Sequence, residues 1–193
     1  MKRLFFLFFT NCLTQNHPIF DLAEHQKEAH PSEIMYAHWR STYYGGNRPK
    51  GCVLCACIND GDHFGNFVLK KFKHNTVLLN LYPYTPWGCF MIASNYHEGS
   101  FQNHSNEAIL ELVQLMKFCE KVLRDDGMEG VNIGTNIGKA AGASIPDHLH
   151  THIVSRKMGD MGFISNIGNL VPISVNLEEQ YKKYKKIFEE LEL

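Results

Sequence analysis

Three histidines occupy alternate positions in the run IPDHLHTHIVSR, at His148, His150 and His152. Apolar or β-branched residues alternate with them. Residues two apart on a β-strand point to the same face of the sheet, so the pattern predicts a row of three imidazole rings. Such a row suits a metal chelate, a chemical site, or simply the polar face of a strand.

Metal binding is the first chemistry to consider. Neighbouring histidines in a His-x-His pair can chelate one zinc ion, which makes His148 and His150 a candidate pair. At the rise of a β-strand, His148 and His152 would lie about 13 Å apart. That distance is too long for all three rings to bind one ion.

The segment NIGTNIGKAAGASIPD (132–147), which precedes the histidines, is rich in glycine and other small residues. Backbone N–H groups can approach a ligand closely in such a segment, and glycine-rich turns commonly bind phosphate oxygens. A neutral imidazole, whose ordinary pKa is near 6.5, is a competent nucleophile at phosphorus near pH 7. A phosphate site beside a row of imidazoles indicates phosphoryl or nucleotidyl transfer.

Hydrophobic patterns predict the elements that would position these residues. Apolar residues recur at helical spacing from Ser105 to Asp126, and a charged amphipathic helix is predicted over 177–193. Short β-branched and apolar runs bounded by turn residues predict strands. These strands cover residues 66–72, 76–81, 89–94, 131–137 and 148–155. The sequence therefore predicts an α+β fold with a five-stranded, mostly antiparallel sheet, one long helix and a C-terminal helix.

The chain of 193 residues suits one domain. We expect residues 35–193 to form it and residues 1–34 to be an extension that carries no chemistry. The apolar stretch 4–9 is too short to span a bilayer, and 19 basic against 20 acidic residues leave no global charge to recruit nucleic acid or a membrane. The cysteines crowded together in GCVLCAC (51–57) fit a reducing compartment, where they would form a metal site or remain free, buried thiols. We therefore expect a cytoplasmic protein.

The predicted long helix is apolar around much of its circumference. Leu110, Val113 and Phe118 fall outside its main apolar stripe. A helix that is apolar on two sides is usually buried on two sides. We expect a homodimer with Val113 and Phe118 in the interface. The alternative is that the N-terminal extension or the C-terminal helix covers this side within one chain.

The run around the three histidines is similar to the signature of the histidine triad (HIT) family, His-φ-His-φ-His-φ-φ with φ apolar. The resemblance extends over most of the chain from about Met35 and is close to the bacterial branch that includes diadenosine tetraphosphate phosphorylases and hydrolases. Its motifs are AHWR (37–40), GCVLC (51–55), LLNLYPYTPWG (78–88), NIGTNIGKAAGASIPDHLHTH (132–152) and KMGDMGF (157–163). The resemblance implies a HIT-like fold.

The resemblance also implies roles for individual residues. His150 would attack the α-phosphate and form a nucleotidyl-histidine intermediate, and His152 would contact the phosphate or the leaving group. Asn80 matches the position that contacts the ribose. The residues that match the phosphate-contacting segment are Asn136, Gly142 and Ser144.

Relatives that carry Cys-x-x-Cys bind zinc through the two thiolates and two histidines. By this resemblance the ligands here would be Cys52, Cys55, His97 and His148, a closed, structural Cys₂His₂ site. The implied function is a nucleotide hydrolase or transferase acting on dinucleoside polyphosphates. The alternatives are a nucleoside phosphoramidate hydrolase and a nucleotide-binding regulatory module with little turnover. No nucleic-acid or membrane partner is expected.

Overall fold

The computed structural model describes residues 51–60, 66–85, 87, 89–160 and 176–193. Within them the chain forms a five-stranded sheet in the order β1-β2-β3-β5-β4. The strands are β1 (Val68–Lys71), β2 (Asn75–Leu79), β3 (Cys89–Ser94), β4 (Gly130–Thr135) and β5 (His150–Arg156). Every neighbouring pair is antiparallel, which confirms the predicted fold class. The domain boundary predicted after residue 34 lies outside the described residues and stays a prediction.

Strand β5 lies in the interior of the sheet, between β3 and β4. Its register places His150 opposite Ala93 and His152 opposite Met91 of β3. On the other side, Gly134 of the edge strand β4 lies opposite His152. His152 is therefore held by backbone pairing on two sides, with β3 and with β4, and His150 is held by pairing with β3.

Two predicted strand boundaries near the histidines are wrong. The strand predicted to begin at His148 begins at His150, and the strand predicted over 131–137 ends at Thr135. The cause at His148 is a turn, because its backbone N–H donates to the carbonyl of Ile145 at 3.3 Å. His148 thus belongs to the loop before β5.

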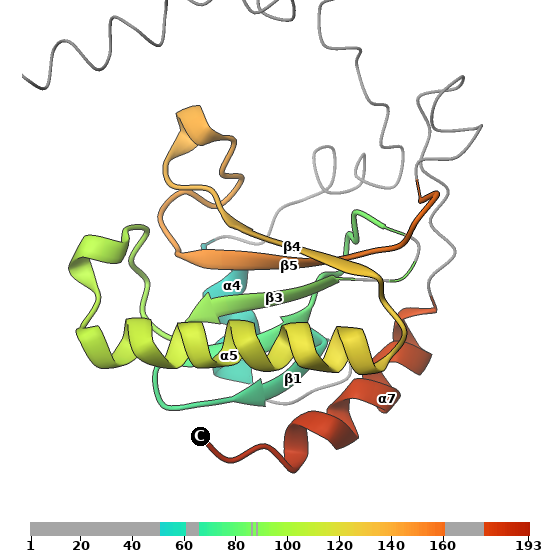
Figure 1. Cartoon of the computed structure of the whole chain (residues 1–193). Helices are drawn as coiled ribbons and strands as arrows, with labels where there is room; N and C mark the ends of the chain where they lie inside the picture. The colour runs from blue at the N-terminus through green and yellow to red at the C-terminus, as the bar shows by residue number, and fades with distance from the viewer. Residues whose placement is uncertain (1–50, 61–65, 86, 88, 161–175) are drawn as a thin grey trace, which may run out of the picture. The chain divides into compact units, whose positions relative to one another are not determined.

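One face of the sheet packs against α5 (Asn106–Asp125) and α7 (Leu177–Glu189), as Figure 1 shows, and the larger core lies there. Helix α5 begins after Ser105, whose side-chain oxygen accepts a hydrogen bond from the N–H of Ala108. The buried side chains of α5 recur at the predicted spacing: Ala108, Leu112, Leu115, Cys119, Val122 and Leu123.

The position of α7 bears on the predicted dimer interface. Phe118 of α5 packs edge-on against Phe188 of α7, with ring centroids 5.2 Å apart. The C-terminal helix therefore covers one side of Phe118 within one chain and leaves it half-buried. Leu110 and Val113 remain 60% and 51% exposed, and the interface stays a prediction.

The opposite face of the sheet carries α4 (Val53–Asp60), a helix that the sequence patterns did not predict (Figure 1). Its buried residues, Leu54 and Ile58, join a second and smaller apolar cluster with Val68, Leu78 and Ala93 of the sheet. None of the helices in the described ranges is long and apolar enough to cross a membrane.

Candidate metal centre and nucleotide pocket

Four side chains from three segments converge beside α4. These are the residues that the motif resemblance implied, and their donor atoms lie within 4.8 Å of one another: Cys52, Cys55, His97 and His148. The Sγ–Nδ1 distance is 3.3 Å for Cys52 with His148, 3.3 Å for Cys55 with His97, and 3.4 Å for Cys55 with His148. Tetrahedral zinc places sulfur and nitrogen ligands about 3.6 Å apart. The donor set and its spacing therefore fit zinc.

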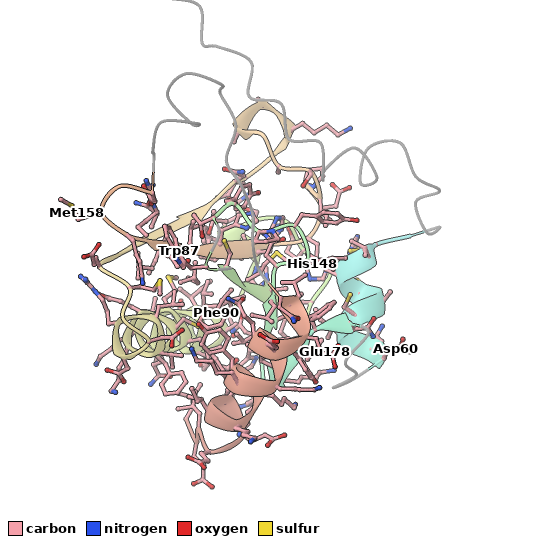
Figure 2. The ribbon with its side chains drawn as sticks, turned by 90° about the vertical axis from the view of Figure 1, so that its right-hand side faces the viewer. Asp60, Trp87, Phe90, His148, Met158 and Glu178 are labelled. Carbon is pink, nitrogen blue, oxygen red and sulfur yellow. The ribbon has the colours of Figure 1, made fainter. Side chains whose placement is uncertain are left out.

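His148 is oriented for metal binding by the strand next to it. Its Nε2 lies 2.7 Å from the carbonyl oxygen of Ser94. A carbonyl only accepts, so Nε2 carries the proton and the lone pair of Nδ1 points at the two thiols. Burial lowers the pKa of His148, which favours the neutral ring that a metal requires. In Figure 2, His148 lies beside α4, away from Phe90 in the larger core.

The side chain of Ser94 forms a further contact that sequence reasoning missed. Its hydroxyl donates to Nε2 of His104 at 2.8 Å. The direction follows because Nδ1 of His104 donates to the carbonyl of Ser100 at 2.9 Å. His104 thereby holds the segment that follows β3, which carries His97. A single sequence gives no signal for this contact.

The thiol of Cys55 is less acidic than an ordinary cysteine thiol when no metal is bound. Burial, followed by the neighbouring Cys52 thiol, raises the pKa of Cys55, so this thiol keeps its proton at neutral pH. A bound cation has the opposite effect on the pKa, since a thiol that coordinates a metal loses its proton. Metal binding at this cluster therefore releases protons.

The two loops that carry the histidine ligands are packed closely together. The N–H of Leu149 donates to the carbonyl of Glu98 at 2.8 Å. Next to this bond, a Cβ built on Gly99 would lie only 2.1 Å from the carbonyl oxygen of Pro146. Only glycine permits this approach, which holds His97 and His148 on adjacent loops.

His150 has one ring nitrogen fixed and the other directed to a pocket. Its Nδ1 lies 2.8 Å from the carbonyl oxygen of His148, so Nδ1 carries the proton and Nε2 carries the lone pair. The side chain is buried and lines the pocket. The ring of His152 lies edge-on to it, with centroids 5.1 Å apart. The tautomer of His150 with its proton on Nδ1 is the one that a nucleophilic Nε2 requires.

The pocket lies on the α4 face of the sheet. It is an open pocket that encloses about 720 Å³ when the space is counted out to its mouth. The structure places four of the predicted site residues in its lining: Asn80, Ser144, His150 and His152. Asn80 directly follows β2, and its Oδ1 accepts a hydrogen bond from the N–H of Tyr82 at 2.9 Å.

Asn136 and Gly142 lie outside this lining. Both belong to the loop between β4 and β5, where the Nδ2 atom of Asn136 lies 4.0 Å from the position of a Cβ built on Gly142. Gly142 has a φ of +85°, in the left-handed region. The loop has a backbone conformation that favours glycine, as its glycine-rich sequence led us to expect. Its contact with phosphate stays a prediction.

Most of the pocket wall was not predicted. Tyr84 packs edge-on against His152, with ring centroids 5.5 Å apart. The remaining apolar lining residues come from α4, from the central strands and from the loops: Val53, Leu54, Cys57, Phe67, Leu78, Leu79, Leu81, Tyr82, Met91 and Ile145. Alternation along β2 and β3 marks Leu78 and Met91 as facing one side of the sheet, but no local pattern shows which side holds a ligand.

Comparison with known proteins identifies the family. The HIT domain model matches residues 54–159, more than half of the chain. This chain belongs to the HIT domain family.

Among curated relatives, the AP-4-A phosphorylase of Mycobacterium tuberculosis is 38% identical over 105 residues, which cover 52% of this chain and 52% of the relative. The chain thus spans about half the length of that relative. An uncharacterised HIT-like protein of Methanocaldococcus jannaschii is 26% identical over 134 residues, covering 69% of this chain and 98% of the relative.

Two solved structures show the same fold. A Zn-bound histidine triad family protein from Mycobacterium smegmatis superposes with a TM-score of 0.58 at 20% identity, covering 72% of this chain and 94% of that one. The diadenosine triphosphate hydrolase of Plasmodium falciparum, in complex with cyclomarin A, gives a TM-score of 0.52 at 22% identity, covering 64% and 77%.

Proposed function

We propose that this chain is an enzyme that cleaves dinucleoside polyphosphates at an α-phosphate and transfers the nucleotidyl group to water or phosphate. The observation that carries the proposal is His150, whose protonated Nδ1 is held by a carbonyl while its ring lines the pocket. A relative named AP-4-A phosphorylase and a fold neighbour named diadenosine triphosphate hydrolase support this substrate class.

The reaction has two displacements at phosphorus. In the first, Nε2 of His150 attacks the α-phosphorus, a P–N bond forms, and the P–O bond to the leaving nucleotide breaks. The leaving nucleotide departs as a phosphate anion. The ring then carries a positive charge, which the carbonyl of His148 stabilises through the Nδ1 hydrogen bond. In the second step an oxygen of water or phosphate attacks the phosphorus, the P–N bond breaks, and its electron pair returns to Nε2, which leaves the ring neutral. An attacking water gives up a proton to the solvent.

The other pocket residues bind and orient the nucleotide. His152 contacts the phosphate oxygens or the leaving group, and Tyr84 holds its ring. Asn80 contacts the ribose from the end of β2. The loop before β5 binds phosphate through backbone N–H groups and polar side chains. The residues assigned to this contact are Asn136, Gly142 and Ser144.

The cluster of Cys52, Cys55, His97 and His148 binds one zinc ion in this proposal. All four ligands come from the protein, so the ion supplies structural cross-linking rather than a site for substrate. The ring of His148 binds the metal while its carbonyl orients His150. The metal centre therefore positions the nucleophile and takes no part in the displacements.

The enzyme works as a homodimer in this proposal. Strand β4 forms one edge of the sheet, and Ile133 on it is 42% exposed. On α5, Leu110 and Val113 expose apolar surface as well. An isologous pair would cover both surfaces at once.

The test uses the full chain with diadenosine tetraphosphate, with and without inorganic phosphate. Hydrolysis yields AMP and ATP, whereas phosphorolysis yields ADP and ATP, so the products identify the acceptor. His150→Ala should lower turnover by about three orders of magnitude or more while AMP binding remains. His74→Ala, which changes a histidine outside the pocket lining, is the matched control and should keep full activity. Turnover of His150→Ala above a few per cent of wild type would contradict the assignment.

A further inference from the structure

Helix α4 contributes to two sites at once. Cys52, just before the helix, and Cys55 in its first turn belong to the metal cluster. Val53, Leu54 and Cys57 line the nucleotide pocket. A stretch of six residues, 52–57, therefore forms part of the metal centre and part of the wall against which a nucleotide would pack.

Helical geometry separates these two sets of side chains. Residues three or four apart share one side of a helix. Cys52 and Cys55 form one such pair and face the histidine ligands. Leu54 and Cys57 form another and face the pocket. A ligand on either side therefore contacts the same short backbone segment without touching the other ligand.

Helix α4 is short and is held by a small number of contacts. It has eight residues, and helices this short are marginal in water without tertiary contacts. Leu54 and Ile58 are its buried residues. At its C-terminal end, Nζ of Lys71 donates to the carbonyl of Ile58 at 3.3 Å. The N-terminal half, which carries the pocket wall, is held by Leu54 in the second apolar cluster and by the two cysteines of the metal cluster.

A second connection joins the two sites at His148. Its Nδ1 faces the thiols of Cys52 and Cys55, at 3.3 and 3.4 Å. Its backbone carbonyl accepts the Nδ1–H of His150, whose ring lines the same pocket as α4. The pocket is thus bounded on two sides by segments that meet at the metal cluster.

We infer that zinc binding and nucleotide binding are thermodynamically coupled through α4. Zinc holds the N-terminal half of α4 against the sheet and completes the pocket wall, so the zinc-loaded protein binds nucleotide more tightly. By reciprocity, bound nucleotide raises the affinity for zinc by the same factor. The ordering of one shared segment is enough for such coupling. This inference rests on the proposed zinc and nucleotide sites.

The first test measures AMP binding by calorimetry in zinc-loaded and zinc-free protein. Coupling energies between sites typically correspond to factors of about 5 to 150, and we expect zinc-free protein to bind AMP about 5- to 50-fold more weakly. Competition with a chromophoric chelator, with and without saturating AMP, should give the same factor for zinc. Equal AMP affinity in both forms overturns the coupling. Absence of AMP binding to the zinc-loaded protein overturns the proposed function as well.

A variant without thiol ligands shows whether the effect is indirect. The double variant Cys52→Ser, Cys55→Ser should bind AMP as weakly as zinc-free wild type, and added zinc should not restore its affinity. Restoration by zinc would mean that zinc acts without the two thiol ligands at α4, which would overturn coupling through α4.

Hydrogen exchange locates the change in the full chain. Removal of zinc should abolish protection of the α4 amides, residues 53–60, and AMP should restore part of it. The α5 amides, residues 106–125, serve as the internal reference and should stay protected. Unchanged protection of α4 overturns the inference, and so does loss of protection in α5, because the metal would then hold the whole fold.

Discussion

Gly99→Ala should damage the metal centre without changing any metal ligand. The added Cβ would lie 2.1 Å from the carbonyl oxygen of Pro146, and 3.1 Å from both the carbonyl carbon of Pro146 and the Cα of Asp147. All three atoms belong to the backbone and cannot rotate away. Since real Cβ atoms essentially never approach closer than 3.0 Å, the two loops must separate by about 0.9 Å, a backbone shift of the kind that overpacking forces.

This displacement is large compared with the tolerance of a metal site. Metal–ligand distances tolerate about 0.2 Å, and Gly99 lies two residues after His97 while Pro146 lies two before His148. We expect zinc affinity to fall at least about tenfold, as for changes in the surroundings of metal ligands. Overpacking should also lower the free energy of unfolding by about 1–3 kcal/mol.

The assay pairs urea unfolding with zinc competition by a chromophoric chelator. Gly134→Ala is the matched control, because a Cβ there has no heavy atom within 4 Å; it should change the free energy of unfolding by no more than about 1 kcal/mol. A Gly99→Ala protein with wild-type stability and zinc affinity would refute the close packing of the two loops.

Three further predictions concern the helices. The hydroxyl of Tyr184 donates to Oδ2 of Asp126 at 2.6 Å, so Tyr184→Phe should lower the free energy of unfolding by about 1–2 kcal/mol; an unchanged urea midpoint would disprove this. Burial, followed by the bond to Asp126, raises the pKa of Tyr184. Above the ordinary tyrosine pKa of about 10 the unfolded chain therefore ionises first, and wild type should lose stability more steeply than Tyr184→Phe. On α5, Val113→Asp should convert a micromolar dimer into monomers in sedimentation; a monomeric wild type would contradict the interface.

The parts of the fold that could be predicted are the helices and strands whose apolar residues recur at a regular spacing in the sequence. The helical spacing of α5 and the alternation along β5 are visible in the sequence because each element buries one face. Helix α4 has no such pattern, since GCVLCAC presents apolar residues or cysteines on every side. It is helical because one side packs on the sheet and the other faces the cluster. The strand predicted from His148 started too early because His148 turns away toward that cluster.

The residues of the candidate site also fall into those that the sequence indicated and those that it did not. Motif positions indicated which histidines and cysteines to consider, and the structure brings those residues together. The partners that orient them come from distant segments, such as Ser94 beside His148 and Tyr84 beside His152. One sequence contains no information on such pairings. For the same reason, the helical pattern of α5 could not show that Phe188 covers Phe118.

The metal cluster also has a consequence for the unfolded chain. Cys55 and His148, which face each other in the cluster, are 93 residues apart in the sequence. An ion held by both would close a loop of that length, as a disulfide does, and closing a loop of about 100 residues removes chain entropy worth about 4.7 kcal/mol. The thiol pair of Cys52 and Cys55 can hold an ion locally before the histidines arrive. Zinc would then stabilise this fold chiefly when the last long loop closes, after much of the sheet has formed.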